Sequence, residues 1–143
     1  MFILDSFSGS NISELNLIPY GTYRSEEPRV IMLSIGGIVK TTMKINNDGT
    51  VSAEFNFLSE SFNNVEVKLG SMKANFKQKK GMIIFFNSSF RKFDLRESAW
   101  NSWETEPATR IDTMFTRGIT EKSFEWYGAA AEQWLLWTKD ENK

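Results

Sequence analysis

The alternation of side chains between positions 39 and 57 constrains the fold of this chain more than any other feature of its sequence. On either side of the polar stretch "NNDG", every second residue belongs to one face of an extended strand, and polar residues fill the positions between. The asparagines and glycine of "NNDG" tolerate the positive φ of a tight turn. The pattern predicts an antiparallel hairpin whose buried face carries Val39, Thr41, Met43, Ile45, Val51, Ala53, Phe55 and Phe57.

Strand signals continue after this hairpin. Residues 65–76 alternate with a shift of parity at Gly70, which indicates a turn or a β-bulge. "MIIFF" at 82–86 is apolar on both faces, so it predicts a central strand that is covered from two sides. Residues 109–119 alternate well enough to form one more strand. The sequence therefore predicts a mainly β fold, either an antiparallel β-barrel or a strongly curved sheet.

The stretch "SFEWYGAAAEQWLLW", residues 123–137, favours a helix instead. Thr120 or Ser123 is a suitable cap for its start, and Lys139 suits its negative end. At helical spacing its apolar residues fall on two stripes. We predict one C-terminal α-helix over 121–139 that packs against the sheet and covers the second face of 82–86. The alternative is that one stripe faces another molecule.

The composition limits the chemistry that the chain can perform. It contains no cysteine and no histidine, which removes thiolate nucleophiles, imidazole bases and zinc–thiolate sites. Its 17 basic residues nearly balance its 18 acidic ones, so it lacks the net charge of a typical nucleic-acid or anionic-membrane binder. We predict no catalytic residue, no cofactor and no metal, and neither nucleic acid nor membrane as a partner.

The length and the first residues indicate how the chain is organised. Its 143 residues fit a single domain, residues 1–143, with one core. The start "MFILDSFSGS" lacks the basic region of a signal peptide and the long apolar run of a membrane span. We therefore expect a cytoplasmic protein.

Charged clusters in the strand region have an ordinary structural interpretation. Lysines at 68, 73, 77, 79 and 80 are typical of a solvated hairpin whose charges discourage edge pairing. The carboxylates of Glu104 and Glu106 would form a hydrolase site only if two carboxyl groups faced each other across a cleft, which sequence spacing does not establish.

Tryptophans are the candidate binding residues. Trp100 and Trp103 lie in the polar segment 96–107, which breaks the alternation, and Glu104 stands beside them. They would form an aromatic and acidic platform for a partner, or they would tuck into the rim of the core and pin the loop. The predicted helix adds a second surface, and a route to self-association, through Trp126, Trp134 and Trp137.

Two short motifs resemble a known family. "YGTY", with Gly21, Thr22 and Tyr23, and a later "DGT", residues 48–50, are similar to the opening of small lipocalin-like (calycin) barrels. The resemblance implies an antiparallel barrel with a C-terminal helix packed outside it, and a ligand pocket inside. Tyr23 stands where the family more often has Trp. A pocket would be lined from the inward face by Met43, Phe55, Phe57, Met72, Phe76 and Phe85, and the same residues would equally fill a closed core.

These observations favour a non-enzymatic binding protein that acts through a protein–protein interface. An accessory, assembly or immunity-type role, such as that of a phage accessory protein, fits a compact domain without catalytic chemistry. The alternative is a lipocalin-like carrier of a small apolar ligand, and a hydrolase with two carboxylates comes third.

Overall fold

The computed structural model describes residues 14–32, 35–60, 63–128 and 132–140, which form ten β-strands. The strands are β1 (Gly21–Met32), β2 (Ile35–Ile45), β3 (Thr50–Leu58), β4 (Val67–Lys79), β5 (Met82–Asp94), β6 (Ala99–Trp100), β7 (Glu104–Thr105), β8 (Ile111–Arg117), β9 (Ser123–Gly128) and β10 (Gln133–Lys139). Within these ranges we find no α-helix, and hence no helix of the length and apolar character needed to span a membrane.

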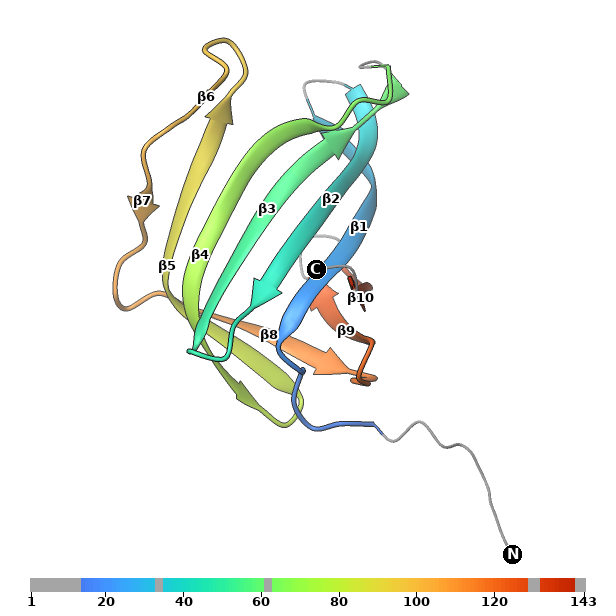
Figure 1. The fold of residues 1–143 in the computed structure, drawn as a ribbon, viewed down its shortest axis with the longest axis vertical. Helices are drawn as coiled ribbons and strands as arrows, with labels where there is room; N and C mark the ends of the chain where they lie inside the picture. Colours follow the sequence, from blue (N-terminus) through green and yellow to red (C-terminus); the bar gives the residue numbers. More distant parts are fainter. Residues whose placement is uncertain (1–13, 33–34, 61–62, 129–131, 141–143) are drawn as a thin grey trace, which may run out of the picture.

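Eight of these strands close into an antiparallel barrel, which confirms the barrel alternative of the sequence prediction. Each strand pairs with its neighbour in the order β1, β2, β3, β4, β5, β8, β9 and β10, and β10 returns to β1 through the pairs Tyr23–Lys139 and Arg24–Thr138. Figure 1 shows β1 to β5 as long, curved strands lying side by side, with shorter strands β8 to β10 completing the wall. β6 and β7 pair with β5 and lie outside the closed ring.

The hairpin predicted from alternation is confirmed as β2 and β3. Ile45 pairs with Val51 and Met43 with Ala53, so the predicted apolar face is continuous across the two strands. In the turn, Gly49 has a φ of 86°, which other residues adopt at a cost. The Thr50 hydroxyl and backbone N–H both donate to Asp48 Oδ1, at 2.6 and 3.0 Å. These two hydrogen bonds lower the pKa of Asp48 below its usual value because they stabilise the carboxylate.

The predicted shift of parity at Gly70 is a β-bulge and not a turn, because β4 continues through it. Opposite it, Phe55 pairs with Gly70 while the next residue, Asn56, pairs with Lys68, so β4 carries one extra residue. A Cβ atom at Gly70 would lie 2.8 Å from the carbonyl oxygen of Arg91, so only glycine permits β4 and β5 to approach this closely here.

The C-terminal α-helix predicted over 121–139 is wrong. The described part of this stretch forms the hairpin of β9 and β10, in which Phe124 pairs with Trp137. Residues 129–131 of the predicted helix lie outside the described residues. The C-terminal helix that the lipocalin-like resemblance implied is therefore also wrong.

Closure of the barrel explains this outcome. β9 pairs with β8, and β10 pairs with β1, so the hairpin satisfies two strand edges that a helix would leave unpaired. The segment also has a period of two within its helical pattern: Phe124 and Trp126 face the barrel interior, and Glu125 and Tyr127 face outward. Aromatic residues favour strands, so local preference and closure agree.

Apolar side chains fill the interior of the barrel. The buried cluster consists of Ile18, Tyr23, Met43, Ile45, Val51, Ala53, Ala74, Phe76, Ile83, Phe85, Ile119, Phe124 and Trp137. The Tyr23 ring is fully buried against Phe124, with 5.1 Å between ring centres, and its hydroxyl donates to the Pro19 carbonyl oxygen at 2.6 Å. Burial raises the pKa of Tyr23 to about 12, because the phenolate would lose its hydration.

The segment before β1 closes one end of the barrel. Ile18 is buried in the core cluster, and its backbone N–H and C=O both hydrogen bond to the side-chain amide of Gln78, at 2.8 and 3.0 Å. The backbone N–H of Leu15 donates to the Ile119 carbonyl oxygen at 2.7 Å. These bonds join the start of the described chain to the β4–β5 hairpin and to the link between β8 and β9.

The prediction that 82–86 is covered from two sides is correct for one face only. Ile83 and Phe85 are buried in the barrel. The alternate residues face outward and are partly exposed, and no described element crosses them; they are Met82, Ile84 and Phe86. The Lys77 ammonium lies 5.6 Å from the ring centre of Phe86, so a neighbouring side chain shields part of this face.

Candidate functional site

Residues 95–110 fold back along the end of β5 that lies away from β8 (Figure 1). Trp100 in β6 pairs with Phe93 in β5, and β7 pairs with the same strand closer to its middle. Asp94 Oδ1 accepts a hydrogen bond from the backbone N–H of Arg96 at 2.9 Å, which fixes the start of the turn. The predicted loop is thus held against the barrel wall by strand pairing.

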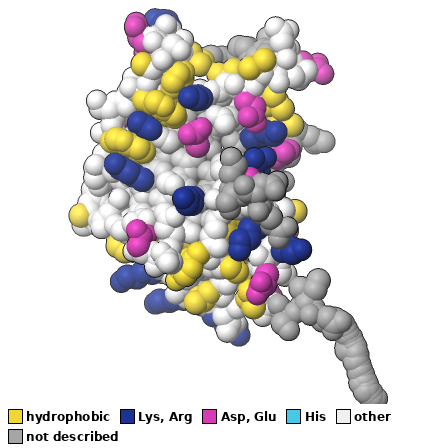
Figure 2. All heavy atoms as spheres, viewed as in Figure 1, with side chains coloured by type: hydrophobic (Ala, Val, Ile, Leu, Met, Phe, Trp, Pro, Cys, Tyr) yellow, Lys and Arg dark blue, Asp and Glu magenta, His cyan; other side chains and the backbone are white. Residues whose placement is uncertain are grey.

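Aromatic and cationic side chains alternate on this part of the outer wall, and we call the stack the tryptophan ladder. In order, it consists of Lys68, Phe93 together with Trp100, Arg91, Trp103 and Lys73. The Arg91 Cζ atom lies 4.2 Å from the ring centre of Trp100 and 4.5 Å from that of Trp103, and the Lys73 ammonium lies 4.3 Å from Trp103. Figure 2 shows the alternating apolar and basic side chains along the left of the molecule.

The ladder fixes the orientation of Arg91. Its guanidinium group is held between two indole rings, and its Nε donates to the hydroxyl of Ser71 at 2.9 Å. Each exposed cation–π contact contributes about 0.5–1 kcal/mol, so the main consequence of the stack is geometric order at the surface. The planar group is pre-arranged to meet a planar anion such as a carboxylate.

A groove of 360 Å³ runs beside the ladder on the outer face of β1 to β5, with Trp103 at one side. Residues that pair across antiparallel strands share a face, and the rows Thr22–Lys44–Ser52–Lys73 and Thr42–Glu54–Ser71–Arg91 supply most of its lining. Its charged groups are three cations and one carboxylate, namely Lys44, Lys73, Arg91 and Glu54. The charged residues of the groove therefore have a net positive balance, although apolar atoms make up most of its accessible surface.

A second groove of 350 Å³ adjoins the first, and both include Ser52 and Lys73. Its remaining polar lining is mainly amide and hydroxyl groups, from Asn46, Thr50, Asn75, Asn87 and Ser89. The Asn87 Nδ2 donates to Asn75 Oδ1 at 3.1 Å. Together the two grooves form a continuous track across the strands, joined at Ser52 and Lys73.

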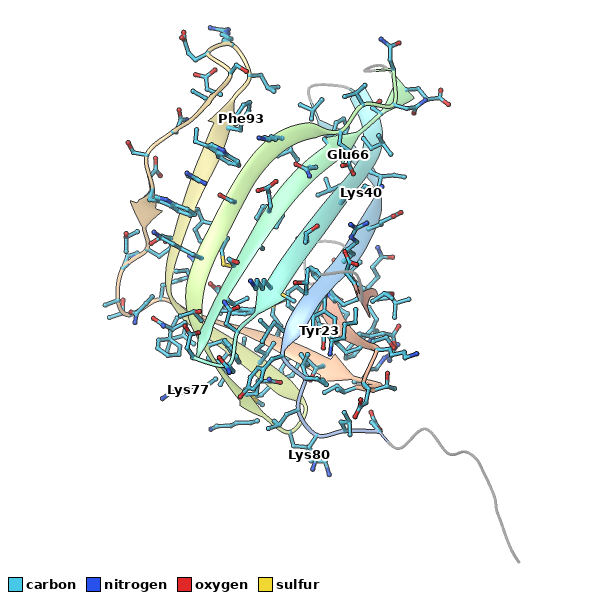
Figure 3. The ribbon with its side chains drawn as sticks, in the orientation of Figure 1. Tyr23, Lys40, Glu66, Lys77, Lys80 and Phe93 are labelled. Carbon is cyan, nitrogen blue, oxygen red and sulfur yellow. The ribbon has the colours of Figure 1, made fainter. Side chains whose placement is uncertain are left out.

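A third, smaller hollow of 110 Å³ on the same wall differs in its charges. There the Lys40 ammonium lies 3.4 Å from Glu66 Oε1, and the Arg24 Nε lies 3.1 Å from Asp140 Oδ2. Figure 3 shows Lys40 and Glu66 close together on this wall. Its cations already have carboxylate partners, so this hollow is a weaker candidate for an anionic ligand.

The structure separates the residues predicted to bind a partner. Trp100 and Trp103 are half-buried members of the ladder, and Glu104 is exposed in β7. Trp126 and Trp137 face the barrel interior, where their rings are 4.7 Å apart, so the helix surface proposed for them is not present.

Trp134 lies on the outer face of β10, away from the ladder. Its ring has the Arg117 Cζ atom at 4.0 Å and the Tyr127 ring centre at 5.6 Å. It therefore has the same kind of cationic neighbour as Trp103, but in a different part of the barrel wall.

The residues predicted to line an internal pocket all face the interior. Met43, Phe57, Phe76 and Phe85 are buried, while Phe55 and Met72 are partly buried against the core cluster. Phe90, which pairs with Met72, was not among the predicted residues and is 39% exposed. The interior is thus packed around Tyr23 and more open near Phe90.

Sequence reasoning missed the cations of the ladder. Lys68 and Lys73 were interpreted as solvated charges of a hairpin, and Arg91 was not singled out. The available signal was their position: all three belong to the polar face of the alternating strands, in register with a loop that contains two tryptophans. The pairing of β6 and β7 with β5 brings the loop to that face.

Comparison with known proteins finds no family model, no curated protein and no solved structure that matches this chain. The residues that carry the lipocalin-like resemblance lie at the start of β1 and in the β2–β3 turn. The relationship to that family stays a hypothesis, since a barrel shape alone does not establish it.

Proposed function

We propose that this protein is a non-enzymatic binding protein that holds a protein partner on the outer face of β1 to β5, at the tryptophan ladder and the adjoining groove. The observation that carries the proposal is the ladder, in which Arg91 is fixed between Trp100 and Trp103 beside an open groove. Tryptophan and arginine are the residues that most often dominate the energy of protein interfaces.

The order already present in the ladder favours binding. A partner that meets flexible surface side chains loses part of its binding energy to their immobilisation, at about 0.5–1.5 kcal/mol for each side chain. Stacking and the hydrogen bond to Ser71 have already restricted Arg91. Such a surface suits an accessory, assembly or immunity-type role for a cytoplasmic protein, and the proposal requires neither a cofactor nor a chemical step.

The test compares tryptophans on two parts of the wall. Tagged wild-type protein, the double variant Trp100→Ala/Trp103→Ala and the control Trp134→Ala are used to capture partners from a lysate of the source organism. Trp134 is a matched control because an arginine also covers its ring. We expect a protein that the wild type and Trp134→Ala both retain and the double variant loses. Loss with Trp134→Ala alone would place the interface elsewhere and contradict the proposal.

A second candidate function is a carrier of a small apolar ligand inside the barrel. Two observations favour it: Phe90 is 39% exposed on the inward face, and the buried Trp137 Nε1–H has no acceptor among the described residues. A ligand oxygen inside the barrel would satisfy that donor. Titration with 1-anilinonaphthalene-8-sulfonate tests it: a carrier would enhance the dye fluorescence in its native state, and Phe90→Arg would abolish the enhancement.

A further inference from the structure

The cations of the larger groove lack carboxylate partners. Among the described residues, the basic members of ion pairs are Arg24, Lys40, Arg110 and Arg117, and none of these belongs to the larger groove. Lys44, Lys73 and Arg91 line that groove, and Glu54 is its one carboxylate. An anionic ligand would balance this excess of positive charge.

The ladder narrows the class of anion. The Trp103 ring already has two cations over it, with the Lys73 ammonium 4.3 Å and the Arg91 Cζ atom 4.5 Å from the ring centre. Nucleic-acid bases and sugar rings bind to tryptophan by stacking on its ring, so they would compete with these two cations. Carboxylates do not compete for the ring, because they pair directly with guanidinium and ammonium groups.

The adjoining groove supplies groups that match a peptide backbone. The hydrogen bond from Asn87 to Asn75 leaves the Asn75 Nδ2 and the Asn87 Oδ1 without partners among the described residues. These two atoms are a donor and an acceptor, the same pair that each peptide unit presents. The groove of Lys44 and Arg91 and the groove of Asn75 and Asn87 therefore recognise different parts of one kind of ligand.

The width of the track sets the length of that ligand. From Thr22 on β1 to Arg91 on β5 the first groove crosses four inter-strand spacings, which is about 19 Å. An extended peptide covers this distance with about six residues.

We propose that the two grooves hold an extended acidic segment of the partner protein. Its carboxylates pair with Lys44, Lys73 and Arg91, and its backbone bonds to the amides of Asn75 and Asn87. This inference rests on the proposed function and specifies the chemistry of the partner.

The probe is a fluorescein-labelled octapeptide in which glutamate alternates with serine, because alternate side chains of an extended peptide share a face. The control peptide has glutamine in place of glutamate. Fluorescence anisotropy with the full chain should show binding of the acidic peptide about tenfold tighter than that of the control peptide, and weaker binding as salt rises.

Two lysine variants form a matched pair. Lys44 is exposed and lines the groove, whereas Lys80 is exposed in the β4–β5 turn. Figure 3 shows Lys80 at the opposite end of the molecule from Phe93 of the ladder. We expect Lys44→Gln to weaken binding about fivefold and Lys80→Gln by less than about twofold. Neither change disturbs the fold, since neither lysine has a described partner. Arg91→Gln should weaken binding about tenfold.

Three outcomes would overturn the inference: no binding of the acidic peptide by the wild type, equal losses for Lys44→Gln and Lys80→Gln, or tighter, Lys44-dependent binding of a heparin hexasaccharide or an oligothymidylate. The last outcome would assign the groove to a polysaccharide or a nucleic acid. The capture experiment separates this result from the proposed function. A captured partner that the acidic peptide does not displace would leave the protein-binding proposal standing and reject the acidic segment.

Discussion

Two pairs of tryptophans lie on opposite sides of the same barrel wall. Trp126 and Trp137 face inward, with their rings 4.7 Å apart among the side chains of the core. Trp100 and Trp103 face outward, and Arg91 separates them. The inner pair removes apolar area from water and contributes to stability. The outer pair is half-exposed, and its main effect is to hold a cation in one orientation.

The role of each tryptophan here follows from the register of its strand and not from its sequence neighbours. β9 and β10 place alternate aromatic residues inside because the two strands complete the ring. β6 lies outside the ring, and its pairing with Phe93 places Trp100 on the polar face.

The largest effect is expected from Trp137→Ala. The side chain is 3% exposed and stacks on Phe124, so its removal leaves a large cavity. The free energy of unfolding should fall by about 3–5 kcal/mol, measured by urea denaturation. Trp134→Ala, on the outer face, should cost about 1 kcal/mol. Equal losses for these two variants would contradict the assignment of Trp137 to the core.

The next effect concerns Tyr23, which packs beside the inner pair through Phe124. Its pKa is raised from 10.0 to about 12, so its contribution to stability is complete below pH 10 and is lost as the pH rises towards 12. The free energy of unfolding should fall by about 1.4 kcal/mol per pH unit in this window, or about 2–3 kcal/mol in total. Denaturation at several pH values measures it. Tyr23→Phe should remove this part of the pH dependence, and an unchanged slope would contradict the prediction.

A smaller effect on stability is expected from Trp103→Ala in the ladder. The ring is half-exposed and touches Arg91 and Lys73, so its loss should cost about 1 kcal/mol of unfolding free energy. Capture of the partner should be lost although the protein remains folded. Trp103→Phe retains a ring and should restore part of the binding. A loss of stability as large as that of Trp137→Ala would show that the outer pair belongs to the core.

The smallest effect is expected from Arg91→Lys. The substitution keeps the charge but removes the planar group that stacks between two rings and bonds to Ser71. Unfolding free energy should change by less than about 0.5 kcal/mol, while affinity for the acidic octapeptide should fall about threefold. A fall in stability without a fall in affinity would show that the ladder stabilises the fold and does not contribute to binding.

The fold could be predicted where the apolar residues fit the period of a strand but not that of a helix. Between residues 39 and 57 a helix would scatter the apolar positions, and the predicted hairpin is present. Residues 123–137 carry aromatic residues at both the helical and the strand spacing. Strand structure was favoured by the free edges of β1 and β8, which lie outside this stretch of sequence. The closure of one barrel end by the segment around Ile18 was missed for the same reason, since the hydrogen-bonding partner of Ile18, Gln78, is 60 residues away in the sequence.

The candidate site could be predicted only in part. Trp100 and Trp103 were singled out because they stand in a polar loop, and they are the centre of the ladder. Glu104 was singled out with them, but it lies in β7, opposite Phe90. Arg91 could not be found without the register of β4, β5 and β6, because its contacts come from two other strands and a loop.

The pairing of β1 with β10 has a consequence for synthesis. A ribosome releases β1 before the other nine strands and β10 after them, so one edge of β1 stays without its neighbour until all the other strands have been made. An open strand edge recruits other chains, which makes the nascent polypeptide vulnerable to aggregation until β10 emerges. Chaperones that shield emerging chains should therefore raise the yield of native protein, and truncation before Gln133 should yield inclusion bodies.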